Sequence, residues 1–259
     1  MRHAAIIEYD GSKFNGWQDQ PHAPSVQAAI ETALSRVADE PIRVHASGRT
    51  DTGVHAVGQV VHFDSDKERT PYNWLRGANS NLPRGVAISW IGPVADEFHA
   101  RFSARSRRYR YILYTRRIPL GIFSDFVSCY PLDLDLQAMQ AGLQALLGTH
   151  DFSAFRASEC QSKKPVKTLH AIDVAQKGDW YWLDVHGDGF LHHMVRNIVG
   201  VMLKIGSGER DPEWAFEVLE GRDRNHGGIT ARPNGLYFLG VHYPEHFQLP
   251  QIMTPPRFW

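Results

Sequence analysis

Arg49 and Asp51 are two positions apart in a short segment that has Gly48 before it and Gly53 after it. Glycine permits backbone angles, and a close approach of a ligand, that a Cβ atom would forbid. A guanidinium that touches a carboxyl group lowers its pKa by roughly 1–3 units, which keeps the carboxylate ionised. These residue types at this spacing are what a reaction that needs a permanently charged aspartate would require.

The residues on either side of this segment are typical of β-strands. Residues 42–45 alternate between apolar and polar side chains, as a half-buried strand does. Residues 57–63 are rich in β-branched side chains. We therefore expect a hairpin whose loop carries Asp51, with the hydroxyl groups of Thr50 and Thr52 placed to hold its carboxylate in one rotamer.

Two other interpretations of the same segment are open. Arg–Asp pairs and Asx turns are common in surface loops, so the segment can be an ordinary connection between strands. The triplet Asp51-Thr52-Gly53 is also the core motif of aspartic proteases, which need two carboxylates that share one proton. The chain has no second Asp-Thr-Gly or Asp-Ser-Gly, so a protease would have to be a homodimer. The adjacent arginine also opposes proton sharing.

A longer motif is more specific than the triplet. The segment Gly48-Arg49-Thr50-Asp51-x-Gly53-Val54-His55-Ala56 resembles the active-site signature of the TruA-type tRNA pseudouridine synthase A family. The resemblance extends to about Pro244, with further blocks in the family's order at 8–12, 16–18, 98–104, 108–111, 150–156, 190–200 and 235–237. Two departures are Thr52, where alanine is common, and Asp19, in a segment that is often more basic.

The resemblance implies an enzyme that isomerises uridine to pseudouridine in tRNA. The bond from uracil N1 to ribose C1′ breaks and C5 joins C1′. The reaction needs no redox chemistry and no energy input, so we expect no cofactor and no metal. Members of the family act on positions 38, 39 and 40 of the anticodon arm and work as homodimers. The implied partners are therefore tRNA and a second copy of the chain.

The same resemblance assigns roles to individual residues. It implies that Asp51 is the catalytic nucleophile, that Arg196 pairs with it, and that Tyr109 is the active-site tyrosine, whose ring can stack on a flipped uracil. Leu236 is expected to line the pocket. The departing uracil is an anion that must be retained, so arginines near the aspartate are more useful than a proton donor, and Arg49 is the local one. The alternatives are structural. Arg196 can lie on an apolar helix with its charged end in water, and Tyr109 and Leu236 can be ordinary core residues.

Seven arginines, four aromatic residues and no acidic residue occur between positions 101 and 117. On a strand, Arg108 and Arg110 share one face and Tyr109 and Tyr111 share the other. A cationic face suits phosphate groups and an aromatic face suits a base. Arg108 and Arg110 are therefore candidate substrate-binding residues. A solvated strand face, or an RNA-binding protein without catalytic activity, would explain the same pattern.

The predicted elements fall into two halves. The first has strands at 4–9, 42–45, 57–63 and 86–94, a helix capped by Ser25, and a helix from Pro71 with a stripe of Tyr72, Leu75, Ala78 and Asn79. This β-α-β-β-α-β order is that of a ferredoxin-like unit. The second half has strands at 107–115, 170–176, 180–186 and 236–242, and helices at 134–147, 192–205 and 212–219.

We expect an α+β fold of two ferredoxin-like-related halves. By resemblance this is the pseudouridine synthase fold, with a shared, mostly antiparallel central sheet and the active-site cleft between the halves. The predicted division is 1–104 with the Asp51 loop, 105–246 with Tyr109 and the Arg196 helix, and an extended tail at 247–259.

Composition limits the other classes of function. Twenty-eight basic residues balance 28 acidic ones, so bulk charge does not indicate a polyanionic partner. Two cysteines fit a reduced compartment and cannot form a four-thiolate metal site. No apolar run approaches the roughly 20 residues that span a membrane, and the N-terminus lacks a signal-peptide core, so we expect a soluble, cytoplasmic protein.

Nucleotide and metal signatures are also missing from the sequence. There is no Walker loop and no G-x-G-x-x-G after a predicted strand. His192 and His193, with His186 and Asp188 nearby, invite a zinc interpretation. We expect no zinc site there, because adjacent histidines point to different helix faces and no i, i+4 spacing occurs.

Overall fold

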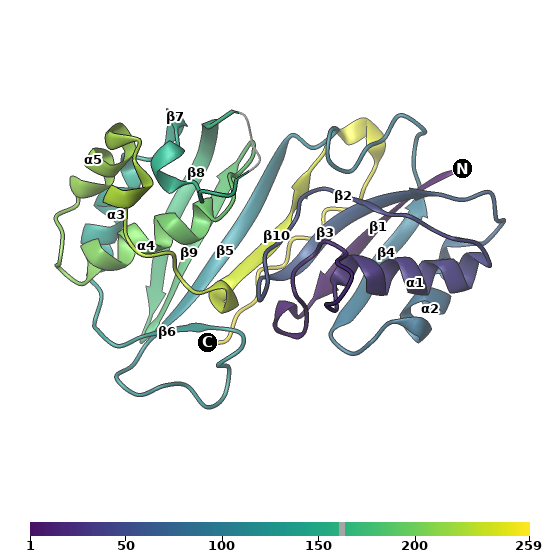
Figure 1. The fold of residues 1–259 in the computed structure, drawn as a ribbon, viewed down its shortest axis with the longest axis horizontal. Helices are drawn as coiled ribbons and strands as arrows, with labels where there is room; N and C mark the ends of the chain where they lie inside the picture. Colours follow the sequence, from purple (N-terminus) through teal and green to yellow (C-terminus); the bar gives the residue numbers. More distant parts are fainter. Residues whose placement is uncertain (161–163) are drawn as a thin grey trace. The chain divides into compact units, whose positions relative to one another are not determined.

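A computed structural model describes residues 1–160 and 164–259. The chain forms two compact units (Figure 1). Unit 1 consists of Met1–Arg105 and Tyr237–Pro256, and unit 2 of Ser106–Leu236 and Arg257–Trp259. The predicted division placed residues 105–246 together, whereas Tyr237–Pro256, which include all but the first residue of the last strand, group with unit 1.

Unit 1 contains a sheet in which β4, β1 and β3 are antiparallel neighbours. The strands of this unit are β1 Arg2–Tyr9, β2 His45–Ala46, β3 His55–Asp64, β4 Val86–Pro93 and β10 Leu236–His242. The other edge of β3 is divided between two strands. Its far end pairs antiparallel with β2, and its beginning pairs parallel with β10, at Tyr237↔His55 and Phe238↔Ala56.

The helices of unit 1 are α1 Val26–Ala38 and α2 Pro71–Asn81, which pack on each other (Figure 1). The predicted cap of α1 is confirmed, because the Ser25 side chain accepts a hydrogen bond from the backbone of Ala28. The predicted stripe on α2 is wrong in part. Trp74 is fully buried, whereas Tyr72 is 64% exposed. Without a structure, two aromatic residues two positions apart on a helix cannot be ranked by burial.

The strand predicted at 42–45 is also wrong, because β2 includes only the last of these positions. The backbone N–H of Ile42 donates to Ser35 Oγ at 2.8 Å, and that of Val44 donates to Glu31 Oε1 at 3.1 Å. Both acceptors are side chains of α1. The alternating pattern therefore reflects packing along a helix rather than pairing in a sheet.

Unit 2 contains an antiparallel sheet in the order β5-β9-β8-β7, with β6 parallel to β5. The bounds are β5 Ser106–Thr115, β6 Ser128–Tyr130, β7 Gly148–Asp151, β8 Val166–Lys177 and β9 Trp180–Gly187. The helices α3 Leu136–Gln144, α4 Met194–Gly206 and α5 Trp214–Gly221 lie on one face of this sheet (Figure 1). Helix α3 is shorter than predicted, and β6 and β7 were not predicted, because segments this short carry little periodicity.

Both units combine helices with mostly antiparallel sheets, which confirms the α+β fold class. Short 3-10 turns complete the elements, at Gly11–Lys13, Ser153–Phe155, Arg224–His226, Pro233–Gly235 and Glu245–Phe247. Within residues 1–160 and 164–259, no helix has the length and apolar character needed to cross a bilayer.

Candidate active site

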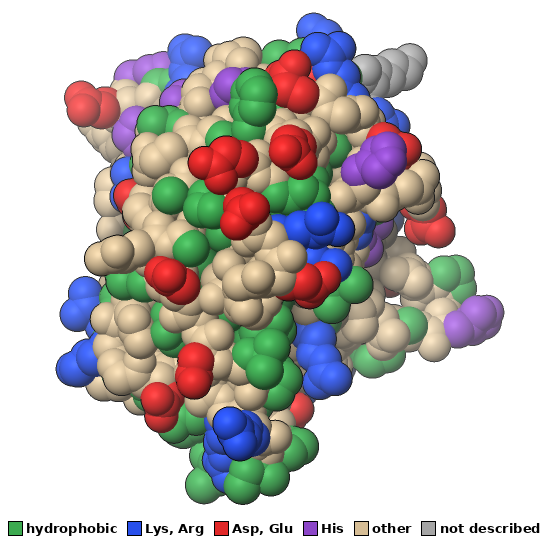
Figure 2. All heavy atoms as spheres, turned by 90° about the vertical axis from the view of Figure 1, so that its left-hand side faces the viewer, with side chains coloured by type: hydrophobic (Ala, Val, Ile, Leu, Met, Phe, Trp, Pro, Cys, Tyr) green, Lys and Arg blue, Asp and Glu red, His purple; other side chains and the backbone are tan. Residues whose placement is uncertain are grey.

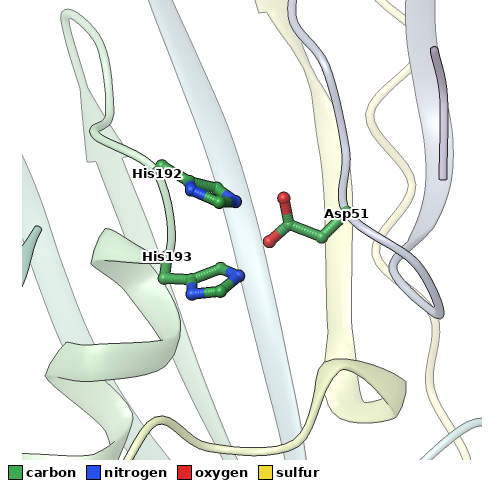
Figure 3. A group of neighbouring side chains, drawn as sticks. All are labelled: Asp51, His192 and His193. Atoms are coloured by element: carbon green, nitrogen blue, oxygen red, sulfur yellow. The ribbon is translucent and has the colours of Figure 1, made fainter. Parts of the chain in front are cut away.

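Asp51 lies in the loop that connects β2 to β3, and its side chain is partly buried (Figure 3). The backbone N–H of Val54 donates to the carbonyl of Asp51 at 3.1 Å, which closes a turn. Gly53 has a φ of 79° within this turn, a conformation that side chains with a Cβ atom rarely adopt. The predicted loop is thus present, and its glycine is needed for the backbone conformation.

The loop is bound to β1 through the hydroxyl group of Thr50. Tyr9 Oη and Thr50 Oγ1 are 2.7 Å apart, and Trp17 N–H donates to the Thr50 carbonyl at 3.0 Å. Burial raises the pKa of Tyr9 to about 12, so its phenol stays neutral near pH 7. The sequence predicts that Thr50 orients the Asp51 carboxylate. Its hydroxyl instead anchors the loop.

A buried glutamine holds the beginning of the same loop. Gln59, on β3, is fully buried, and its Nε2 donates to the carbonyl of Gly48 at 2.7 Å. Its Oε1 accepts a hydrogen bond from Ser47 Oγ at 2.6 Å. Both ends of the Gln59 amide therefore form hydrogen bonds with the loop. They fix the backbone next to Arg49 and Asp51 without adding a charge.

Backbone packing restricts the far end of the loop. A Cβ atom at Gly11 would lie 2.0 Å from the carbonyl oxygen of Val54, so only glycine fits there. The N–H of Gly11 donates to His55 Nδ1 at 3.1 Å, and the His55 ring stacks on Tyr237 of β10 at 4.8 Å between centroids. The Asp51 loop is thus fixed from β1, β3 and β10, while the Arg49 side chain is exposed.

In unit 2, β5 carries the predicted tyrosine. The partly exposed ring of Tyr109 makes an edge contact with Phe190, with centroids 4.9 Å apart. Tyr111 is 1% exposed, and its hydroxyl group contacts Ser128 Oγ and donates to the carbonyl of Arg232. Burial raises the pKa of Tyr111. Tyr111 is therefore a core residue, whereas Tyr109 presents an accessible ring.

The two arginines of β5 that were predicted to bind substrate differ. Arg110 is 7% exposed, and it forms two hydrogen bonds with the directly opposite Asp184, of 2.7 and 2.6 Å. Its guanidinium also lies over the Trp182 ring at 5.7 Å. Arg108 is exposed. Only Arg108 therefore presents its charge to solvent, because a cross-strand carboxylate binds Arg110.

Arg196 lies in the first turn of α4. Its Nε donates to the carbonyl of Ala231 at 2.7 Å, and the N–H of Ala231 donates to the carbonyl of Arg196 at 3.1 Å. Arg196 and Lys204 are the residues of this helix that are not buried. The reciprocal contact with Ala231 fixes the base of the guanidinium group.

A polar network beneath α4 fixes the segment that contains Ala231. Asn197 is 2% exposed, and its Oδ1 accepts hydrogen bonds from Thr230 Oγ1 at 2.7 Å and Arg224 Nη2 at 3.1 Å. Burial lowers the pKa of Arg224. A Cβ atom at Gly200 would lie 1.8 Å from a backbone oxygen of the same segment. Arg196 is thus positioned by a close helix–loop contact.

His192 and His193 precede α4, and His193 occupies its N-cap position with a φ of 62° (Figure 3). Their ring centroids are 4.0 Å apart. We had argued that adjacent histidines would point to different faces of a helix. That argument is wrong, because the helix begins only at Met194 and both residues belong to the preceding turn.

Leu236, the first residue of β10, is 5% exposed. The neighbouring Gly235 packs against the backbone of β5, where an added Cβ would lie 2.5 Å from the carbonyl oxygen of Ile112. Its predicted role as a pocket wall stays a prediction, since a core leucine would be equally buried.

Charge is unevenly distributed over unit 2. Helix α5 presents exposed Glu213, Glu217 and Glu220. Figure 2 views this end of the chain, where acidic side chains are spread over the surface. Phosphate groups would be repelled there, which leaves the Arg108 side of the sheet as the more suitable surface.

Several residues that hold the site were not predicted from sequence, namely Tyr9, Gln59, Asn197 and Arg224. Tyr9 and Gln59 lie on predicted strands, where a polar side chain is usually expected to be exposed to solvent. The only available signal was their position among apolar neighbours, and it does not show what they bind.

Comparison with known proteins gives a consistent result. A family model described as tRNA pseudouridine synthase matches residues 5–103 and 143–244. The tRNA pseudouridine synthase A of Nitrosococcus oceani is 51% identical over 259 residues, which cover 100% of both chains. The protein of the same name from Shewanella woodyi is 51% identical over 258 residues, covering 100% of this chain and 99% of its own.

Proposed function

The chain belongs to the tRNA pseudouridine synthase family and is an isomerase, and we propose that it converts uridine to pseudouridine at positions 38, 39 and 40 of tRNA. The observation that carries this proposal is the 51% identity, over the whole chain, to relatives named tRNA pseudouridine synthase A. That identity includes both units. The restriction to the anticodon arm comes from the family resemblance.

Asp51 is the proposed nucleophile. When the N1–C1′ bond breaks and the C5–C1′ bond forms, C5 loses its proton to solvent and N1 takes up a proton, so the composition of the nucleotide is unchanged. The chemistry therefore calls for a charged group in a fixed place and for no co-substrate. The support for Asp51 is its loop, in which Gln59, Tyr9 and the backbone of Trp17 restrict movement.

Unit 2 is proposed to supply the remaining groups. Arg196 would serve as the guanidinium partner of the carboxylate, and the partly exposed ring of Tyr109 would stack on the everted uracil. Leu236 would form an apolar wall of the pocket. Arg49, on the same loop as Asp51, would stabilise the negative charge of the departing uracil.

The arginines of β5 are proposed to act differently from each other. Arg108 is exposed and suits a phosphate contact. Arg110 is bound by Asp184, so its contribution to substrate binding would be to hold β5 against β9. We also propose that the chain acts in the cytoplasm as a homodimer, in keeping with the family resemblance. Light scattering of the purified protein with and without tRNA would measure its oligomeric state.

Tritium release tests the proposed reaction. Transcripts labelled with [5-³H]uridine should lose tritium when incubated with the enzyme. Replacement of the uridines at positions 38, 39 and 40 by cytidine should abolish the release. Release that persists in the substituted transcript would show that the enzyme acts elsewhere in tRNA.

A non-catalytic RNA-binding protein is the alternative to an enzyme. It would bind tRNA in a salt-dependent manner and release no tritium. It would also leave the fixed geometry of the Asp51 loop without a role, whereas catalysis requires such preorganisation.

A further inference from the structure

The segment 98–104 of unit 1 connects β4 to β5 and presents an aromatic side chain to solvent. The ring of Phe102 is 76% exposed. The guanidinium of Arg101 lies over this ring, 5.7 Å from its centroid, and Arg101 is itself exposed. None of the roles proposed above uses either residue.

Hydrogen bonds hold this segment in one conformation. His99 Nδ1 accepts from the backbone N–H groups of Arg101 and Phe102, at 3.2 and 3.3 Å. The N–H of His99 donates to Ser103 Oγ at 3.0 Å, and the N–H of Ser103 donates back to the His99 carbonyl at 2.9 Å. The exposed ring is therefore carried on a compact turn that is closed by its own imidazole.

Two further contacts attach the turn to the body of unit 1. The N–H of Ala100 donates to His62 Nδ1 at 3.1 Å, and Tyr243 Oη donates to the Ala100 carbonyl at 2.6 Å. Phe98, at the start of the segment, is fully buried. An aromatic side chain on so rigid a base loses little entropy when it binds a ligand.

The ring of Phe102 is the outer member of a row of rings. Its centroid is 4.3 Å from that of His99, which is 4.5 Å from that of His62, and His62 stacks on His45 at 5.0 Å. Arg101 adds a positive charge at the exposed end of the row. An exposed aromatic ring with a guanidinium over it matches a nucleobase and its phosphate, because bases stack on aromatic rings and phosphates pair with arginine.

We infer that Phe102 and Arg101 form a binding site for an unpaired nucleotide of the RNA substrate, with the base stacked on Phe102 and its phosphate on Arg101. This inference rests on the proposed function and adds a contact away from the reacting nucleotide. His62 is seven residues after His55 along β3, which corresponds to about 23 Å in a strand. The base on Phe102 is therefore a different nucleotide from the one at Asp51.

A protein partner is the other conceivable occupant of an exposed phenylalanine. The surroundings favour RNA, because exposed Arg101, Arg105 and His45 lie on or beside this segment. Asp64, which lies at the same end of β3, is bound by two hydrogen bonds from Arg2, so its negative charge is neutralised. Exposed Asp96 and Glu97 precede the buried Phe98 along the chain, whereas the residues that flank the exposed ring, Arg101 and Arg105, are positive and suit a phosphate group.

The test is tRNA affinity, measured by fluorescence anisotropy in an Asp51→Asn background so that binding is read without turnover. Phe102→Ala should weaken binding by about 5- to 150-fold, the range found for the loss of one base–aromatic stack. Phe102→Trp keeps a stacking surface and should bind like the parent. Tyr72→Ala, which removes another exposed aromatic residue of unit 1, is the matched control and should leave affinity unchanged.

Three results would overturn the inference. They are an unchanged affinity in Phe102→Ala, an equal loss in Phe102→Trp, and an equal loss in Tyr72→Ala. An unchanged affinity together with normal tritium release in the otherwise wild-type enzyme would reject this contact while the proposed reaction stands. A wild-type enzyme that releases no tritium would instead reject the proposed reaction, whatever the binding results are.

Discussion

The Asp51 loop of unit 1 and strand β5 of unit 2 are both charged motifs, but they are fixed by different forces. The loop is held by neutral hydrogen bonds, one between the hydroxyl groups of Tyr9 and Thr50 and one from Gln59 to the Gly48 carbonyl. The strand is held by an ion pair, because Arg110 is bound by Asp184. The neutral hydrogen bonds fix the backbone on which Asp51 is carried, whereas the ion pair fixes the charged side chain of Arg110 itself.

This difference predicts which substitutions change turnover and which change stability. Charged residues that are proposed to act on the substrate should affect turnover, and charged residues that fix one strand against another should affect stability. Our predictions test this distinction, from the largest expected effect to the smallest.

Substitution of Arg196 should have the largest effect on turnover. Arg196→Ala removes a proposed partner of the reacting carboxylate, and we expect kcat to fall by about 10²–10³, the cost of losing one preorganised charge-stabilising group. The affinity for tRNA should change little. Single-turnover rates and anisotropy measure the two quantities separately. Equal losses in rate and affinity would make Arg196 a binding residue and would remove the contrast with Arg110.

Acid should destabilise unit 1 through His62. Its pKa is lowered to about 4, first by burial and then by the neighbouring His99, His45 and Arg2, with Asp64 opposing. The native state thus keeps His62 neutral while the unfolded chain binds a proton near pH 6.5. Stability should be full above pH 6.5 and should fall by about 3 kcal/mol between pH 6.5 and pH 4.

The matched variant for this effect is His62→Gln. Its amide oxygen can still accept the hydrogen bond from Ala100 N–H, but it does not titrate. Urea unfolding at several pH values should therefore show a smaller loss of stability in the variant. An identical pH dependence in both proteins would locate the acid sensitivity elsewhere.

Breaking the ion pair of unit 2 should lower stability without affecting the chemistry. Asp184→Asn removes the carboxylate charge that forms two hydrogen bonds with the buried Arg110 guanidinium. We expect a loss of about 2 kcal/mol, below the roughly 3–5 kcal/mol of a fully buried pair, because Asp184 is 40% exposed. Asp173→Asn, an exposed position directly opposite on β8, is the control. A loss of kcat at full stability would contradict the structural role of Arg110.

Tyr9→Phe should have a smaller effect on stability and a specific effect on rate. It removes one buried hydrogen bond, worth about 1 kcal/mol, between β1 and the Asp51 loop. Because the loop then moves more freely, kcat should fall while KM stays nearly constant. Tyr181→Phe removes a comparable buried hydrogen bond to Leu134 in unit 2 and should lower stability alone. Equal effects on kcat in both variants would show that the hydrogen bond between Tyr9 and Thr50 has no specific role in catalysis.

Removal of metal ions should have no effect. The proposed reaction uses a carboxylate and guanidinium groups and needs no metal. Dialysis against a chelator should therefore leave tritium release and the thermal midpoint unchanged. A loss of activity that zinc restores would revive the zinc interpretation of His192 and His193.

Local patterns in the sequence predicted much of the fold. Helix α1 was predicted from its apolar periodicity and its Ser25 cap, α2 from the proline at its start, and β3 from its β-branched residues, and strands were also predicted at the positions of β1, β5, β8 and β9. The failures involve long-range contacts. The backbone of Ile42 and Val44 is satisfied by side chains of α1, and β10 pairs with β3 across most of the chain. Neither contact leaves a local signal.

The residues of the candidate site also fall into two groups, those that a local pattern predicts and those that long-range contacts define. Asp51, Arg49 and Gly53 were recognisable because their types and spacing carry a chemical meaning on their own. Gln59 and Asn197 were not, because a buried amide is defined by the groups that it binds. Arg110 was predicted to bind phosphate, since sequence cannot show that Asp184 lies opposite it.

The central claim is that the Asp51 carboxylate carries out an isomerisation of uridine. The most direct measurement is single-turnover tritium release with enzyme in excess over [5-³H]uridine tRNA, for the wild type and for Asp51→Asn. We expect rapid release by the wild type, and a rate reduced by at least about 10⁴-fold in the variant, with tRNA still bound. Release by Asp51→Asn at the wild-type rate would contradict the claim.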